Sequence, residues 1–428
     1  MITSTIGKIF LTAYNEKYGC KYDARTFFDE VYFPLFFDNN KYMQWVQNSP
    51  FVQMKKGQKV EKLSSEERLE KLENLHEKIE NGAVDASVAI GYAASEEKEF
   101  ATTSGQVTNM TLSICKDEIY LSWIGSSLGI GLQGGISILL TEPLILMSIF
   151  EGWKVYRQLL TTNENLKGNQ ISTWNGQWIS HRYSADYDEK RPMANFDPFE
   201  TKENEMSIKT QSWTKVLLSL SDCFQRIQLM GYVYNFGQTN TTIGFIPFIL
   251  PEIRRPREMY LKLFGSIGSK EAETLWGTAH GLKICCQSGA IGVKAMEPKG
   301  VQTFMEKAVV PTSKNIEKKK ITYQIYIIWI LAMLNNENLW DLSHDFAQIL
   351  QDYIKQDDKE FSKQKTNQVN CVLNSKTKRS FIAALTEIVK GAPDKAAISL
   401  IAKEINLMPT ENVPYFLTLI RYQYAAIN

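Results

Sequence analysis

The segment 321–334, ITYQIYIIWILAML, most constrains the fold, because it is apolar on almost every side. A helix of this kind has to be buried among other helices. Apolar residues then recur at the helical period in the segments 342–354, 381–389, 398–405 and 415–424. Short connections between successive amphipathic helices make them antiparallel neighbours. We therefore predict an all-α helical bundle over residues 321–428.

The sequence before the bundle mixes helical and strand patterns. Aromatic residues at helical spacing fill 22–42, and we interpret them as core rather than as a stacking platform for bases. Ser64 and Glu67 have the pattern of a capping box and predict a helix start. His76 lies beside the apolar stripe of that helix, and we expect it at the surface.

Strands are predicted where β-branched and aromatic residues cluster between breaks, at 88–92, 106–114 and 118–124. A short polar run at 313–320 indicates a linker. The predicted fold class is therefore α+β. A mixed α/β N-terminal domain with long polar loops covers 1–312, and the C-terminal helical bundle covers 321–428.

Composition limits the class of protein. Among 428 residues the apolar share is 44% and the charged share 22%, as in ordinary globular proteins. Six cysteines without a framework spacing favour a reducing, cytoplasmic location, and the N-terminal residues do not predict a signal peptide. The net charge is only +1, so an anionic partner needs a local cationic patch.

One apolar segment, 128–150, is nearly long enough to span a membrane. Gln133, Glu142 and Pro143 lie in its interior, where an unpaired carboxylate is costly. We therefore favour a buried core segment and expect no membrane partner. A membrane-associated structural protein is the alternative interpretation of this segment.

Gly129, Gly131 and Gly134 match the spacing G-x-G-x-x-G after a predicted strand. A dinucleotide site also needs a helix that opens directly on the last glycine. Here any helix is stopped by Pro143, so a hairpin bend or a close backbone approach is the favoured interpretation. The alternative function is a nucleotide-dependent cytoplasmic enzyme that uses the loop Gly129–Gly135.

The sequence assigns no catalytic residue, metal site or cofactor. The histidines at 76, 181, 280 and 344 are far apart, and none has metal-ligand spacing. We favour structural roles for His280 with Cys285 and Cys286, and a solvated helix face for His344. No nucleophile stands beside a candidate base, so we predict a protein without catalytic activity.

Cationic residues do cluster, in three places. Phosphate contact is favoured by cations on loops and helix starts, although ordinary solvated surface has the same composition. The first cluster lies in a turn bracketed by prolines, the second in the predicted linker, and the third at a helix start. Their residues are Arg254, Arg255, Arg257 and Lys262; Lys318, Lys319 and Lys320; and Lys376, Lys378 and Arg379.

Amide side chains gather in the segment 167–182, which is predicted to be an exposed loop. Asparagine and glutamine side chains suit the reading of base edges. The residues assigned to base contact are Asn169, Gln170, Asn175 and Gln177, with the flanking cations Lys167 and Arg182.

The layout resembles the large subunit of type I CRISPR effector complexes (Cascade), in which a mixed α/β part precedes a compact helical bundle. The segments NSKTKRSFIAAL (374–385) and VPYFLTLIR (413–421) are similar to bundle ends in that family. The resemblance covers the layout of the whole chain and these short segments only.

The resemblance implies a non-catalytic subunit of a multisubunit complex that contains CRISPR RNA. Such a subunit recognises the protospacer-adjacent motif in target DNA, holds the displaced strand and offers a surface to a helicase-nuclease that acts in trans. The guide RNA reads the sequence, whereas the protein reads the short motif and the phosphates. No motif of the family maps onto the amides and cations named above, so their assignment depends on residue type alone.

Overall fold

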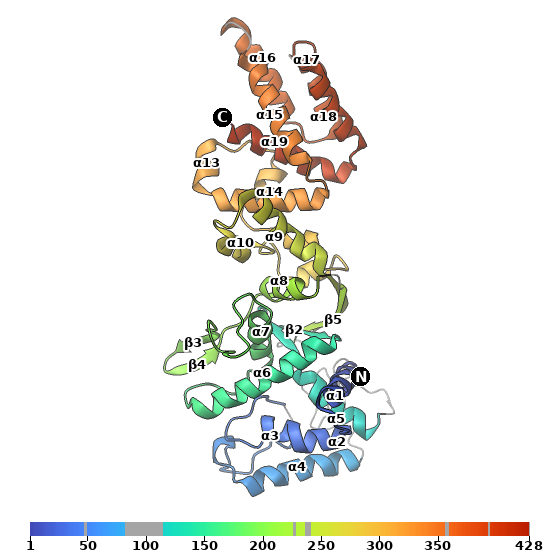
Figure 1. The fold of residues 1–428 in the computed structure, drawn as a ribbon, viewed down its shortest axis with the longest axis vertical. Coiled ribbons are helices and arrows are strands. Elements are labelled where there is room, and N and C mark those ends of the chain that lie inside the picture. Colours follow the sequence, from blue (N-terminus) through green and yellow to red (C-terminus); the bar gives the residue numbers. More distant parts are fainter. Residues whose placement is uncertain are drawn as a thin grey trace. The chain divides into compact units, whose positions relative to one another are not determined.

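The computed structural model describes residues 1–46, 49–81, 114–225, 228–235, 241–355, 359–392 and 394–427. Helices dominate and the sheets are small, which confirms the α+β class and the helical C-terminal part (Figure 1). Internal contacts separate two compact units: unit 1 is Met1–Pro251 with Leu282–Ile291, and unit 2 is Glu252–Gly281 with Gly292–Asn428. The strand predicted at 88–92 and nearly all of that at 106–114 lie outside the described residues.

The helices of unit 1 gather around an aromatic core. They are α1 (Ile2–Tyr18), α2 (Ala24–Phe27), the π-helical turn η1 (Phe28–Tyr32), α3 (Phe33–Phe36), the 3-10 turn η2 (Val60–Lys62), α4 (Ser65–Glu80), α5 (Lys116–Ser127), α6 (Pro143–Thr162), α7 (Ile171–Arg182), α8 (Trp213–Cys223) and α11 (Leu282–Cys286). The aromatic residues of η1 and α3 are buried against Trp123 and Trp153, which confirms their interpretation as core. The capping box of Ser64 and Glu67 at the start of α4 is also confirmed.

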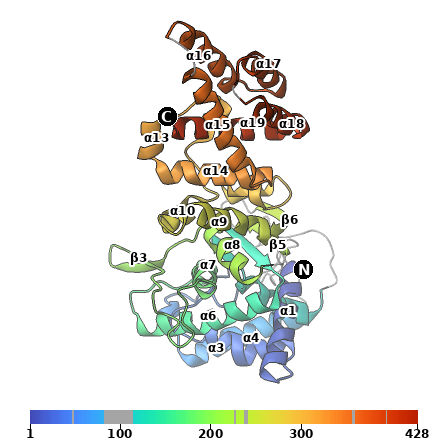
Figure 2. The ribbon, with the colours of Figure 1, turned by 45° about the horizontal axis from the view of Figure 1, so that its top comes forward.

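The main sheet of unit 1 is antiparallel, with the strand order β1-β2-β5-β6. Its strands are β1 (Ile130–Leu132), β2 (Ile136–Leu140), β5 (Gln228–Asn235) and β6 (Thr241–Ile249). A separate hairpin pairs β3 (Phe199–Lys202) with β4 (Glu205–Ile208); Figure 1 labels both strands, and Figure 2 labels β3. Registers such as Ile138 opposite Val233 bury apolar residues in the sheet.

The glycine-rich segment forms the β1–β2 hairpin, which confirms the favoured interpretation. Gly134 and Gly135 form its turn with φ of 83° and 70°, a left-handed conformation that suits glycine. A β-carbon on Gly131 would lie within 3.0 Å of the main chain of Ser172, so α7 approaches the strand closely. No helix opens on this loop, which therefore lacks the geometry of a dinucleotide site.

Residues 118–124 form part of helix α5, so their prediction as a strand is wrong. Every residue from Ile119 to Ser127 is buried, and burial on all sides removes the helical periodicity from the sequence. Helix α1 crosses α5 at two glycines: a β-carbon on Gly7 would overlap the carbonyl of Leu121, and one on Gly125 would overlap that of Thr3. The two helices therefore meet main chain to main chain.

His76 is buried rather than exposed, contrary to the prediction from sequence. Its side chain on α4 is only 5% exposed and its Nδ1 lies 2.7 Å from the hydroxyl of Tyr120 on α5. Its Nε2 lies 3.2 Å from a carboxylate oxygen of Asp29. The histidine thus joins α4, α5 and η1 through polar contacts inside the core.

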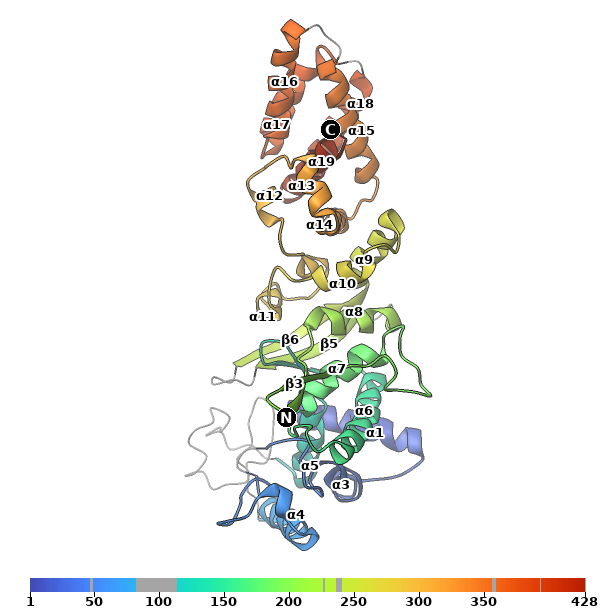
Figure 3. The ribbon, with the colours of Figure 1, turned by 90° about the vertical axis from the view of Figure 1, so that its left-hand side faces the viewer.

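Unit 2 is helical, and Figure 3 shows α16 and α17 side by side. Its elements are the C-terminal part of α9 (Leu250–Phe264), α10 (Ser269–Leu275), the 3-10 turn η3 (Val293–Met296), α12 (Gln302–Glu306), α13 (Ser313–Lys318), α14 (Lys320–Leu334), α15 (Leu339–Lys355), α16 (Lys359–Leu373), α17 (Lys378–Val389), α18 (Lys395–Leu407), the 3-10 turn η4 (Thr410–Asn412) and α19 (Val413–Ala426). Helix α14 is buried nearly all round, as predicted.

Two features of unit 2 differ from the sequence predictions. The segment 313–320 is not a linker, because it forms α13 and the first residue of α14. Helix α16 was not predicted, because its polar sequence carries few apolar residues. Among the described residues, no helix combines the length and the apolar character needed to cross a membrane.

Candidate nucleic-acid interface

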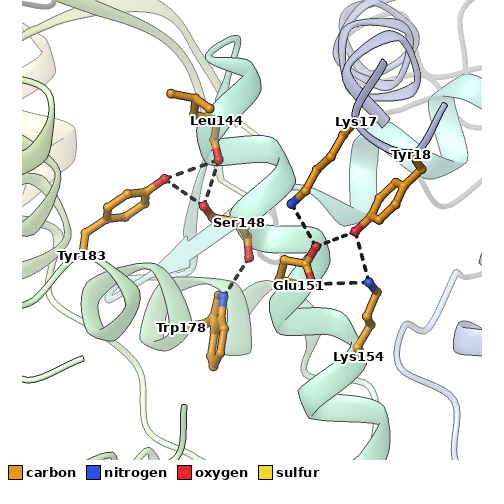
Figure 4. A network of polar contacts seen from close by, with 8 residues as sticks. All are labelled: Lys17, Tyr18, Leu144, Ser148, Glu151, Lys154, Trp178 and Tyr183. Atoms are coloured by element: carbon orange, nitrogen blue, oxygen red, sulfur yellow. Dashed lines mark hydrogen bonds and ion pairs between the residues drawn. The ribbon is translucent and has the colours of Figure 1, made fainter. Parts of the chain in front are cut away.

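The amide-rich segment is mostly helix α7, so its prediction as an exposed loop is wrong. Tryptophans fix this helix on α6: the indole of Trp174 donates to the carbonyl of Gly152, and that of Trp178 to the carbonyl of Ser148, both at 2.8 Å. The hydroxyl of Tyr183 also contacts Ser148 (Figure 4). Glycine at 152 allows this approach, because a β-carbon there would overlap the Trp178 ring.

Asn175 lies in the core of unit 1 and is fully buried. Its Nδ2 donates to the carbonyls of Ser127 (2.8 Å) and Gly129 (2.9 Å), and its Oδ1 accepts from the indole of Trp153 at 3.2 Å. Gln177 is also buried, and its Nε2 donates to the carbonyl of Lys209 at 2.7 Å. Both amides satisfy groups inside the fold, so neither is placed where it can read a base.

The other residues of this segment lie nearer the surface. The Gln170 side chain accepts from the backbone N–H of Ile208 at 3.2 Å, which ties the start of α7 to β4. The guanidinium of Arg182 stacks over the ring of Tyr187 at 4.4 Å. Lys167 and Asn169 are exposed, and Lys167 forms an open ion pair with Glu205 at 3.6 Å. Of the amides predicted to read bases, Asn169 is the exposed one.

The arginine cluster lies on helix α9, so the predicted turn is wrong: Pro256 is inside the helix. Each cation there has a partner in unit 2. Arg254 pairs with Glu258 at 2.8 Å, and the others contact carboxylate or amide oxygens, namely Arg255 with Asn335, Arg257 with Glu273 and Lys262 with Glu337. Three of the four cations are paired with carboxylates, which leaves the cluster poorly suited to bind a polyanion.

The second cluster is at the junction of α13 and α14. Lys318, Lys319 and Lys320 are all exposed, and none has a carboxylate partner among the described residues. Lys319 is the N-cap of α14 without a side-chain capping bond, and the first turn contains no acidic residue. A cation at this positive end of α14 is unfavourable by about 0.3–1 kcal/mol, whereas Lys318 and Lys319 also lie at the C-terminal end of α13, where a cation is favourable. The junction therefore concentrates positive charge that the fold leaves uncompensated.

The third cluster opens α17, and its three cations differ in role. The amine of Lys378 donates to the carbonyls of Asn406 and Met408, both at 2.9 Å, so it caps α18. Lys376 and Arg379 are exposed, and neither has a carboxylate partner in the part of the chain that the structure describes. They form a second cationic site at a helix start without a carboxylate, because this first turn also lacks an acidic residue and is capped by the neutral side chains of Thr377 and Ser380.

A buried arginine that was not predicted holds this turn in place. Arg421 on α19 is 2% exposed, and its guanidinium donates to the carbonyls of Leu373 (2.6 Å) and Ser375 (2.5 Å). Burial lowers the pKa of Arg421 to about 10. The signal in the sequence is a single cation inside the apolar run VPYFLTLIRYQY. Such a residue has to find polar partners when its helix is buried.

Comparison with known protein families, with curated proteins and with solved structures found no match to this chain.

Proposed function

We propose that this chain is a non-catalytic, nucleic-acid-binding subunit, and specifically the large subunit of a type I CRISPR effector complex. In this role it recognises the protospacer-adjacent motif in target DNA and holds the displaced strand. The observation that supports the proposal is the pair of exposed cationic sites at the starts of α14 and α17. The resemblance in layout supplies the specific family.

The physical case depends on where these cations lie. The positive end of a helix normally carries acidic or neutral capping residues, because its free N–H groups attract negative charge. Lysine and arginine at that end add their own charge to these N–H groups. A phosphate group interacts with the free N–H groups and with the charged side chains, because it accepts hydrogen bonds from the main chain and forms ion pairs with the cations. Lys318, Lys319, Lys320, Lys376 and Arg379 are therefore the proposed phosphate contacts.

The first experiment compares wild type with the triple variant Lys318→Glu, Lys319→Glu and Lys320→Glu. The control makes the same charge change at three exposed lysines elsewhere, Lys8, Lys59 and Lys403. Anisotropy of labelled single-stranded and duplex DNA is measured over a series of salt concentrations. The slope of log K against log salt falls by about 0.9 for each phosphate that the protein no longer neutralises, so the slope of the triple variant falls by up to about 2–3.

Two results would contradict the proposal at different levels. Equal slopes for the triple variant and the control remove the α14 site from the interface. For the specific family, the tagged full chain is co-expressed with its neighbouring genes and purified. Co-purification with other subunits and a guide RNA is expected, and recovery of the chain without RNA rejects the assignment to a CRISPR effector.

A further inference from the structure

Trp45 is the most exposed tryptophan of unit 1. Its side chain is 51% exposed. Of the other eight tryptophans in the chain, seven are buried and Trp340 is half-buried. Leaving so large an aromatic side chain in water forgoes the stabilisation that its burial would give. An exposed indole beside a polar hollow is therefore a candidate for contact with a planar ligand.

Trp45 lines a cavity of about 480 Å³ in unit 1, which is within the usual size range for sites of small ligands. Its walls come from the segments 40–45, 60–61, 164–169 and 204–205. Four asparagines line it: Asn40, Asn165, Asn169 and Asn204. All four are exposed, and their amide groups form no hydrogen bond with the described residues. They therefore offer donors and acceptors to a ligand.

Hydrogen bonds of Lys41 and Arg157 hold one wall of the cavity in place. The amine of Lys41 donates to three carbonyls at the end of α6, those of Asn163, Glu164 and Leu166, at 2.7–2.9 Å. The guanidinium of the buried Arg157 donates to the carbonyl of Lys41 at 2.8 Å. These contacts fix the chain that leads to Trp45. A fixed wall lowers the entropic cost of binding a ligand.

The charges that line the cavity disfavour an anionic occupant. The lining contains Lys41 and Lys167 against Glu61, Glu164 and Glu205. Lys41 is occupied by carbonyls and Lys167 by Glu205, so no free cation is left to hold a phosphate deep in the site. Unpaired bases are neutral, stack on aromatic rings and present edges that amides can hydrogen-bond. A saccharide is another neutral ligand that stacks on tryptophan. Its hydroxyl groups do not form a planar edge of donors and acceptors, which a base presents to an amide side chain.

We propose that this cavity holds one unpaired nucleobase, stacked on Trp45 and bonded at its edge by Asn169. The inference rests on the proposed function, because it gives the displaced or opened strand a place in unit 1. Only the base enters the cavity, and the sugar and phosphate remain outside it.

The test uses neutral nucleosides, so that the result does not depend on the cationic sites of unit 2. Saturation-transfer NMR is recorded on the full chain with adenosine, cytidine, guanosine and thymidine, and with a neutral trisaccharide. Trp45→Leu removes the ring, Trp45→Phe keeps an aromatic ring, and Asn169→Gly removes the amide while allowing the left-handed backbone at this position (φ 60°). We expect transfer to the base protons in wild type. Affinity falls about 5- to 150-fold in Trp45→Leu, which corresponds to about 1–3 kcal/mol of stacking, and is partly restored in Trp45→Phe.

Three outcomes overturn the proposal: no transfer to any nucleoside, transfer that is unchanged in Trp45→Leu, or Trp45-dependent binding of the saccharide alone. Thermal unfolding of each variant is measured as the folding control, and an exposed side chain predicts little change. Failure here leaves the salt-dependent DNA binding of the lysine sites intact. Equal salt slopes in the triple lysine variant and its control, with nucleoside binding retained, count against the proposed function instead.

Discussion

The substitution Asn175→Ala separates two interpretations of the same residue. The sequence prediction assigns Asn175 to base reading, in which case its loss weakens DNA binding and leaves the fold intact. The structure places it at a buried junction of α5, α6, α7 and the β1–β2 hairpin, with three hydrogen bonds. We therefore expect the opposite result, a loss of stability in unit 1.

The size of the loss follows from the groups left without a partner. These are the carbonyls of Ser127 and Gly129 and the indole N–H of Trp153. Each buried group without a partner costs about 1–3 kcal/mol, which gives a total of about 3–9 kcal/mol. Water that enters the space vacated by the amide recovers part of this. We expect the free energy of unfolding to fall by about 3–5 kcal/mol.

Urea unfolding followed by circular dichroism measures this change, and thermal unfolding provides a second measurement. A unit of this size loses about 2–4 °C of Tm per kcal/mol, so the midpoint falls by about 6–20 °C. The control is Asn74→Ala, which removes an exposed amide on helix α4 of the same unit and should change stability by less than about 0.5 kcal/mol. A loss below about 1 kcal/mol in Asn175→Ala, with weaker DNA binding, refutes the structural role.

Two further predictions concern stability. Arg421→Met leaves the carbonyls of Leu373 and Ser375 without a partner and should lower the free energy of unfolding of unit 2 by about 2–5 kcal/mol, measured by urea unfolding. The control Arg379→Met changes an exposed arginine and should have little effect. Equal effects of the two substitutions would contradict the role given to the buried guanidinium. Burial raises the pKa to about 12, above the unfolded value of 10.0, for Tyr42, Tyr120 and Tyr422. The folded state therefore keeps protons that the unfolded state releases, and this stabilisation is complete below pH 10 and lost as the pH rises through 12. Ultraviolet titration should show that some tyrosines ionise only well above pH 10, at the pH where circular dichroism shows loss of helix. Ionisation of all 19 tyrosines near pH 10 while the helices remain intact would contradict this prediction.

The sequence predicts well those elements whose local chemistry agrees with their burial. Helix α14 is uniformly apolar and is buried, and the capping box of Ser64 and Glu67 starts α4 as predicted. The glycine hairpin is predicted because two adjacent glycines suit its left-handed turn. In each case one short segment contains the whole physical reason for its conformation.

The candidate site is predicted less well, because burial of polar residues depends on distant partners. Nothing near Asn175 in the sequence shows that its amide bonds Ser127 and Gly129, some 46–48 residues earlier. The arginines of α9 look like a turn because prolines flank them, yet Arg257 forms an ion pair with Glu273 on α10 and Arg255 forms a hydrogen bond with Asn335 at the end of α14. Cations at the start of α14 stay exposed, since no carboxylate lies in that first turn.

The crossing of α1 and α5 has an evolutionary consequence. A methyl group at position 7 or 125 would collide with the opposite backbone, so a common descent would leave these two positions less free to change than the exposed residues of the same helices. Glycine at both places is expected to outlast recognisable similarity in the surrounding residues. A later alignment of distant relatives would test this through the retention of glycine at both positions.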